Sequence, residues 1–142
     1  SSVALYTICS KLLNAIIKKV IIIAYSQGSI IIAKVLNSLH KLGLDKEIYL
    51  KKLEIYCFSN CSSHMCYIKD ELPYMEHFAN NNDFVAKLGC NCPNEIKDLI
   101  KIDGPIFINK SGHGHILNLH YLKNFSNNYP LSRLNNYIKF KN

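Results

Sequence analysis

Arginine is nearly missing from this sequence, since Arg133 is the only arginine among seventeen basic residues. The guanidinium group is the side chain best suited to bidentate contacts with phosphates and nucleobases. The lysines are scattered along the chain without a long basic block, so the net charge of +7 describes a solvated, lysine-rich surface. We therefore expect no nucleic-acid partner in spite of the positive charge.

Long apolar runs are also lacking. The run at 20–24 has five residues and ends in a polar turn, whereas a membrane span needs about 20. No segment has the pattern of a secretory signal peptide. These absences predict a cytoplasmic protein and leave contact with a membrane surface open. The chain begins at Ser1 without a methionine, which indicates a processed chain or a fragment and keeps an upstream signal as the alternative.

The cysteines lack the spacing of a metal site, because no pair of CxxC motifs occurs among them. There are six: Cys9, Cys57, Cys61, Cys66, Cys90 and Cys92. A chain of this length buries a core without a disulfide framework, so free thiols and a reducing compartment are expected, with Cys57 buried in an apolar run. We expect no metal and no cofactor. A zinc-binding module built on Cys90, Cys92 and histidines is the least favoured alternative.

What the chain does have is an alternation of strand-like and helix-like segments. Its 142 residues, 49% of them hydrophobic, suit a single domain spanning 1–142. The hydrophobic spacing predicts helices at 3–18, 29–42, 116–125 and 130–140, helical turns at 95–100, strands at 20–24, 53–58, 74–79 and 106–109, and loops at 59–72 and 111–115. This order predicts an α/β fold, a three-layer sandwich with a mainly parallel sheet.

Three kinds of polar residue follow predicted strands. Ser26 follows the first strand, Asp83 the third, and His113 and His115 the fourth. In parallel sheets the working residues gather at the carboxyl ends of the strands. A serine, an acid and a histidine in this order are therefore expected at one edge of the sheet.

The segment Ala24-Tyr25-Ser26-Gln27-Gly28 has the form small-x-Ser-x-small between a strand and a helix. In a nucleophile elbow the serine lies on a sharp, strained turn, and the residues two before and two after it come close together. Ala24 and Gly28 are small enough for this role. The backbone N–H of Gln27 would then face the oxyanion. The alternative is an ordinary turn in which Ser26 caps the helix.

A serine hydroxyl needs a base, and the base needs an acceptor that fixes its tautomer. Asp83 lies between Ser26 and the histidines in chain order, although a loop aspartate or a helix cap is the alternative reading. His113 and His115 lie in one glycine-flanked loop, and both could be surface histidines. His77 lies within a strand and is expected to be packed or hydrogen-bonded.

With these residues in place, the chain resembles the carboxy-terminal part of an α/β-hydrolase of the lipase and serine-esterase branch. It is similar to a group of uncharacterised fungal-type hydrolase-like proteins in four segments: IIIAYSQGSIIIAKVLNSL, LEIYCFSNCSSHM, MEHFANNNDFVAKLG and GHILNLHYLKNF. The resemblance implies a nucleophile at Ser26, an acid at Asp83 and a base at His115, which heads the G-H-I-L-N stretch. Tyr25 departs from this group, where histidine is frequent, and is expected to tune the site.

The resemblance also implies a truncated α/β-hydrolase fold without the amino-terminal strands. These strands supply the second oxyanion N–H and cover the edge of the nucleophile strand. The expected function is a serine hydrolase that cleaves a lipid-like or small acyl ester through an acyl-enzyme. A non-catalytic remnant or fragment is the alternative. The partner expected is a small-molecule or lipid ester, and no feature of the sequence defines an oligomeric state.

Overall fold

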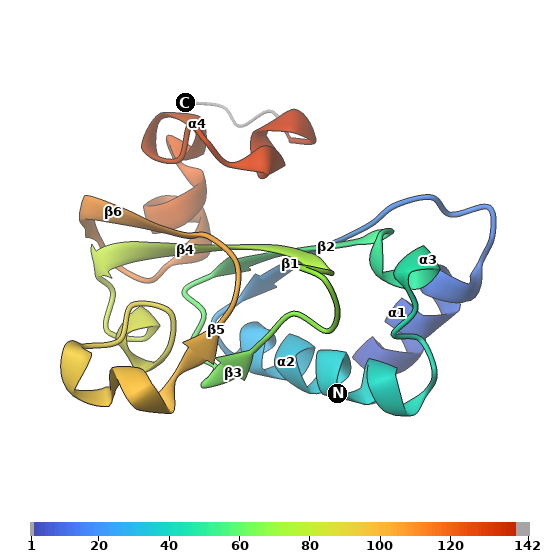
Figure 1. Ribbon diagram of the computed structural model, residues 1–142. Helices are drawn as coiled ribbons and strands as arrows, with labels where there is room; N and C mark the ends of the chain where they lie inside the picture. The colour runs from blue at the N-terminus through green and yellow to red at the C-terminus, as the bar shows by residue number, and fades with distance from the viewer. Residues whose placement is uncertain (1, 139–142) are drawn as a thin grey trace.

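The fold is built on a four-stranded sheet, seen in a computed structural model that describes residues 2–138. Its strands are β1 (Val20–Tyr25), β2 (Leu53–Phe58), β4 (Tyr74–Asn82) and β6 (Ile106–His113), in the order β1-β2-β4-β6. Every neighbouring pair is parallel, so the prediction of an α/β fold with a parallel sheet is confirmed. All four strands end at one edge of the sheet (Figure 1).

Helices cover both faces of this sheet (Figure 1). The long helices α1 (Ser2–Leu13) and α2 (Gln27–Lys41) lie on one face, with the short α3 (Glu47–Leu50) beside them. The π-helical segment η3 (Leu117–Leu122), α4 (Phe125–Asn128) and the 3₁₀ turn η4 (Arg133–Asn136) lie on the other. The remaining elements are two 3₁₀ segments, η1 (Ala86–Leu88) and η2 (Asn94–Leu99), and the two-stranded sheet of β3 (His64–Met65) and β5 (Lys101–Ile102).

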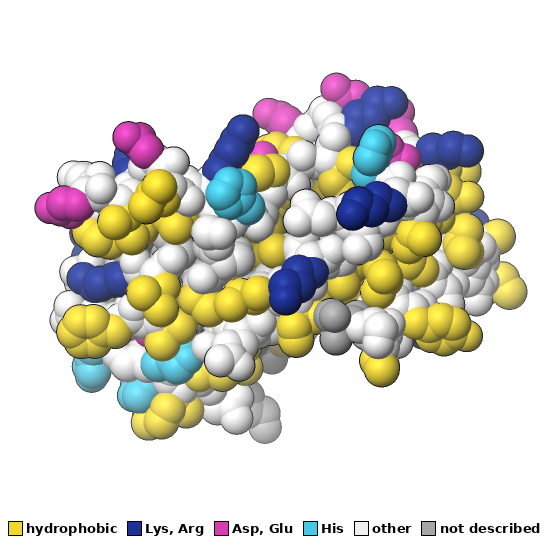
Figure 2. Space-filling model, turned by 90° about the horizontal axis from the view of Figure 1, so that it is seen from below, with side chains coloured by type: hydrophobic (Ala, Val, Ile, Leu, Met, Phe, Trp, Pro, Cys, Tyr) yellow, Lys and Arg dark blue, Asp and Glu magenta, His cyan; other side chains and the backbone are white. Residues whose placement is uncertain are grey.

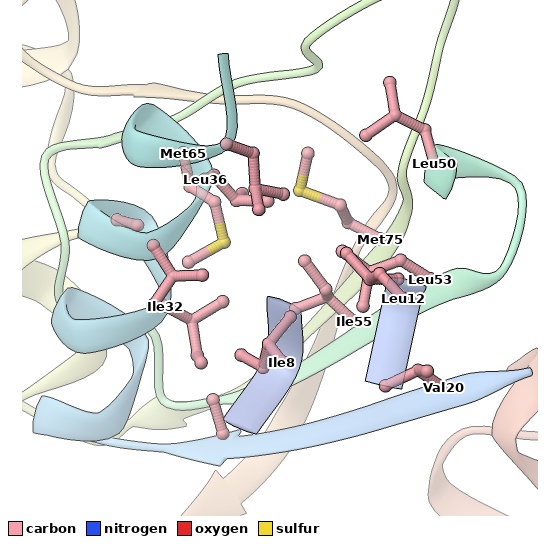
Figure 3. Close-up of a cluster of buried hydrophobic side chains, with 14 of the residues drawn as sticks. Ile8, Leu12, Val20, Ile32, Leu36, Leu50, Leu53, Ile55, Met65 and Met75 are labelled. Carbon is pink, nitrogen blue, oxygen red and sulfur yellow. The ribbon is translucent and has the colours of Figure 1, made fainter. Parts of the chain in front are cut away.

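The two faces bury different kinds of side chain. On the α1 and α2 face the core is aliphatic, and Figure 3 shows Leu12, Leu36 and Ile55 pointing into it from a helix, a second helix and a strand. On the opposite face the buried cluster is mainly aromatic: Tyr56, Phe58, Phe78, Tyr121, Phe125, Tyr129 and Leu134. Burial of these apolar surfaces is the main favourable term that holds the helices to the sheet.

Helices depart from the sequence prediction at several places. α2 begins at Gln27, two residues before the predicted start, and α3 was not predicted. The helix predicted at 116–125 is the π-helical η3 followed by α4. The first helix ends at Leu13 instead of residue 18, because the Asn14 side chain accepts the Ile16 N–H at 3.0 Å and forms a local turn. Ile16 lies inside the predicted helix but beyond the observed one, and its side chain is exposed. The helix predicted at 130–140 is reduced to η4, and its last two positions lie outside the described residues.

Three strands run further than predicted, β1 by the single residue Tyr25. β4 continues to Asn82, and β6 continues to His113, where the sequence indicated a loop from 111. The pairing of β4 with β6 shifts register between Asn80 and Asn82, which is how both strands extend past an irregular point. β3 and β5 were not predicted, since two residues each are too short to give a periodic signal.

β1 is an edge strand of the sheet, as expected from the resemblance. Its neighbour on one side is β2, and the side chains of Ile21 and Ile23 are partly exposed.

The basic side chains are spread over the surface. Viewed from below Figure 1, they lie apart from one another among hydrophobic and uncharged ones (Figure 2). Among residues 2–138, no helix is long and apolar enough to cross a membrane.

Candidate functional site

Ser26 lies on a strained turn between β1 and α2. Its backbone has φ 56° and ψ −121°, a region that non-glycine residues rarely adopt. The Ser26 N–H donates to the Phe58 carbonyl at 2.9 Å, which continues the β1–β2 pairing up to the turn. The Ser26 carbonyl accepts the Ser29 N–H at 3.0 Å and the Ser29 hydroxyl at 2.5 Å. The Ser26 side chain makes no capping bond, so its hydroxyl is free for another partner.

That partner is His115. Its Nε2 lies 3.0 Å from Ser26 Oγ, although the two residues are 89 positions apart in the chain. Its Nδ1 lies 3.1 Å from Asp83 Oδ1 and 3.0 Å from Oδ2. The structure thus brings together the three residues singled out in the sequence, in the geometry of a nucleophile, a base and an orienting acid.

Asp83 is almost completely buried at the end of β4, with 1% of its surface exposed. Its Oδ1 accepts the Val85 N–H at 3.0 Å, and its Oδ2 accepts the Tyr121 hydroxyl at 2.5 Å. Burial alone would raise the pKa of Asp83, but hydrogen bonds from Tyr121, His115 and Ser59 outweigh it and hold the pKa below its usual value. The acid is therefore a carboxylate at neutral pH, as an orienting group must be.

Tyr25 and Asn80 hold the backbone around His115. The Tyr25 ring stacks on the His115 ring at 5.0 Å, and its hydroxyl donates to the His115 carbonyl at 2.5 Å. The buried Asn80 side chain donates to the carbonyls of Gly114 and His120 at 3.2 and 2.8 Å. Ile116, which follows His115, is 57% exposed, so burial of its side chain does not hold His115.

Ser59 is a site residue that the sequence did not indicate. It follows β2 with φ 57°, is fully buried, and places its Oγ 3.1 Å from His115 Nδ1. It also hydrogen-bonds to Asp83. The available signal was its position directly after a buried strand, but a single serine there has no distinguishing pattern.

The other candidates lie away from the Ser26 hydroxyl. His113 neighbours His120, with ring centroids 6.1 Å apart, and the two line an open hollow of about 460 Å³ on the outer side of β6. His77 is buried as expected and bonds to Asn60 and to the Asp103 carbonyl. Of His113, the last residue of β6, and His115, in the loop after it, His115 is the one that contacts the serine.

The remaining predicted positions surround the turn. Gln27 is the first residue of α2, where a backbone N–H has no acceptor within the helix and can serve an anion. A Cβ atom added to Gly28 would lie 4.0 Å from the Ala24 Cβ, which is an ordinary contact. Positions 24 and 28 are therefore close, as a nucleophile elbow requires. An alanine would still fit at position 28 beside Ala24.

The cysteines form no centre within residues 2–138, where no group of three His, Cys, Asp or Glu side chains could hold a metal ion. Cys57 and Cys90 are buried, and burial raises the pKa of both thiols, that of Cys90 to about 12. Such thiols are unreactive at neutral pH.

Comparison with known proteins adds no relative. No family model matches the chain, and neither a curated protein nor a solved structure gives a significant match.

Proposed function

We propose that this chain is a serine hydrolase of the α/β-hydrolase type that cleaves a lipid-like or small acyl ester. The observation that carries the proposal is the position of His115 between Ser26 and Asp83, with Nε2 on the serine oxygen and Nδ1 on the carboxylate. A solvent-exposed serine beside a histidine would be weak support. Here the acid is buried, the turn is strained, and both sides of the imidazole are occupied.

The chemistry follows from these contacts. As Ser26 Oγ attacks the ester carbonyl, its proton passes to His115 Nε2, and the carbonyl electron pair moves onto oxygen. The Gln27 N–H stabilises that oxyanion. The alcohol then leaves with the proton from His115, and a water molecule repeats the sequence on the acyl-enzyme. Asp83 keeps the Nδ1 proton in place and stabilises the imidazolium.

The described residues offer one oxyanion donor, the Gln27 N–H. In α/β-hydrolases a loop ahead of the nucleophile strand supplies a second N–H, and residues 1–19 contain no HGGG-like segment. Absence of one donor costs about 3 kcal/mol, or roughly 10² to 10³ in rate. A protein made of residues 1–142 alone should therefore turn over slowly, with a nucleophile that still reacts.

The alternative is a non-catalytic protein that retains the triad. The edge position of β1 favours it, because the side of the Ser26 turn away from β2 has no neighbouring strand among the described residues. Water on that side of the Ser26 turn would raise the local dielectric constant and so weaken the electrostatic contacts of the site.

A fluorophosphonate separates the two functions. It should phosphonylate Ser26 with loss of fluoride, and intact mass should rise by one adduct in the wild type and not in Ser26→Ala. Ser63→Ala, at an exposed serine in the loop after β2, is the matched control and should react like the wild type. An unlabelled wild-type protein, or an adduct that survives Ser26→Ala, would refute the hydrolase.

A further inference from the structure

We propose that Tyr121 is a positioning residue of the triad, which clamps the Asp83 carboxylate in the orientation that His115 needs. The inference rests on the proposed function. It starts from a contact that the chemistry above does not use: the Tyr121 hydroxyl lies 2.5 Å from Asp83 Oδ2, and the tyrosine side chain is fully buried.

The direction of that hydrogen bond is fixed by a second one. The Asn80 backbone N–H donates to the Tyr121 oxygen at 3.0 Å, at the place where the pairing of β4 with β6 shifts register. An amide can only donate, so it occupies a lone pair of the phenol oxygen. The Ser59 hydroxyl also hydrogen-bonds to Tyr121, but the Asp83 carboxylate can only accept, so the phenol proton is directed at Asp83 Oδ2. The register shift in β4 thus orients the hydroxyl as a donor to the acid.

The carboxylate is held from both ends. The Val85 N–H donates to Oδ1 and the Tyr121 hydroxyl donates to Oδ2, so both oxygens stay close to His115 Nδ1, Oδ1 at 3.1 Å and Oδ2 at 3.0 Å. The Tyr121 ring is itself fully buried and packs edge-on against Phe58 within the aromatic cluster. A clamp of this kind acts on geometry, and a base held in one orientation reacts faster than a loose one.

The electrostatics agree with this geometry. Burial, followed by the bond to Asp83, raises the pKa of Tyr121 above its usual value, so the phenol stays protonated wherever Asp83 is ionised. The groups that face Asp83 from the surrounding elements are His115, Tyr121, Ser59, Tyr25, Cys90 and Tyr129. Of these, only His115, Tyr121 and Ser59 are side chains that hydrogen-bond to it.

The chain provides a matched pair of tyrosines for the test. Tyr129 belongs to the same buried cluster, and its hydroxyl also reaches Asn80, at 3.3 Å from Oδ1, but it is not bonded to Asp83. Tyr121→Phe and Tyr129→Phe therefore each remove one buried hydroxyl next to Asn80. Only the first removes a donor from the acid.

The measurement is the rate of fluorophosphonate labelling and the turnover of a p-nitrophenyl ester. Tyr121→Phe should lower kcat and the labelling rate roughly 10-fold with little change in KM, as expected for loss of a hydrogen bond to a charged group, while Tyr129→Phe stays near the wild type. The acidic limb of the kcat/KM profile should also move to higher pH in Tyr121→Phe alone, because Asp83 loses a donor. Equal effects of the two variants would overturn the clamp.

A double-substitution cycle tests whether Tyr121 acts through the acid. In an Asp83→Asn background, adding Tyr121→Phe should change the labelling rate little, since the group it clamps is already neutral. Full additivity of the two losses would contradict the proposal. A wild type that does not label refutes the hydrolase itself, whereas normal labelling of wild type and Tyr121→Phe alike refutes only the clamp.

A measurement on the wild type covers the case in which Tyr121→Phe does not fold. In protein labelled with ¹³C at the aspartate carboxyls, the resonance assigned by its loss in Asp83→Asn should titrate below the ordinary aspartate range. Titration at or above that range would mean that the carboxylate is not held by its donors, and the clamp would be wrong.

Discussion

His115 reaches Ser26 because its own backbone is tied down on both sides. Tyr25 bonds its carbonyl, and Asn80 bonds the carbonyl of the preceding Gly114. Gly114 has φ 91°, and a side chain there would run into the His120 ring, so the turn that presents His115 requires glycine. The identity of the base is thus a property of one backbone turn.

Substitutions at His113 and His115 should differ sharply in their effect. His115→Ala removes the only imidazole that contacts Ser26 among the described residues, and labelling should fall by about 10⁴ or more. His113→Ala changes a ring at the outer hollow and should leave most of the labelling. The readout is the second-order labelling rate with the fold checked by circular dichroism. Loss of labelling in His113→Ala with retention in His115→Ala would reverse the assignment.

At the scale of elements, the unit that matters is the strand, turn and helix around Ser26. The serine alone carries the positive φ, while Gly28 lies inside α2 with its Cβ position 4.0 Å from Ala24. The strain of the turn is therefore stored at Ser26 and not at Gly28. Glycine at position 28 leaves room next to Ala24, and the size of side chain that fits there can be measured by substitution.

The turn should tolerate Gly28→Ala and should be destabilised by Gly28→Val. Alanine fits at ordinary contact distance and favours the helix, so the melting temperature should be kept or raised and labelling retained. The branched valine carries its methyl groups beyond the Cβ toward Ala24, and it should cost about 1–3 kcal/mol and slow labelling. Melting curves and labelling rates check both variants. A Gly28→Val protein as stable and reactive as the wild type would mean that the turn is not packed as described.

The sequence predicted the parts of this fold that carry periodic signals. The β-branched run at Val20 and the apolar run at Leu53 identified parallel strands that are neighbours in the sheet. Chain order placed Ser26, Asp83 and the histidines 113 and 115 at one end of the strands, and the resemblance selected His115. The roles of Ser59 and Tyr121 were not predicted, because their contacts depend on which strands become neighbours in the sheet. No local sequence pattern encodes that order. The end of the first helix was missed because a single side-chain bond, from Asn14, decides it.

For the molecule as a whole, acid stability should depend on a histidine remote from Ser26. His77 is buried in β4, and burial, only partly offset by the Asp103 carbonyl, lowers its pKa to about 4. In the unfolded chain His77 binds a proton below about pH 6.5, whereas in the folded chain the ring stays neutral down to about pH 4. Protonation therefore favours the unfolded chain, and the contribution of His77 to stability is complete only above pH 6.5. This stability is lost as pH falls from 6.5 toward 4, by up to about 1.4 kcal/mol per pH unit.

Urea unfolding at pH 7 and pH 5 measures this loss. His77→Gln should start less stable at pH 7, because it disturbs the bonds to Asn60 and the Asp103 carbonyl, but should lose less between the two pH values. His64→Gln, at an exposed histidine, is the control and should keep the wild-type difference. Asp83 and Glu54 have lowered carboxyl pKa values and act at more acidic pH. The same pH dependence in His77→Gln as in the wild type would contradict the assignment.

The last strand of the sheet, β6, is partly exposed, and its local unfolding would affect the reactivity of Ser26. β6 is the other edge of the sheet, and none of its residues is fully buried, whereas all six residues of β2 are. Segments with little buried surface open at lower free energy than the core. Undocking of β6 would carry His115 away from a Ser26 turn that stays folded on β2. Reactivity of the serine would then report the fraction of molecules with the last strand in place, and would fade on warming before the bulk of the sheet unfolds.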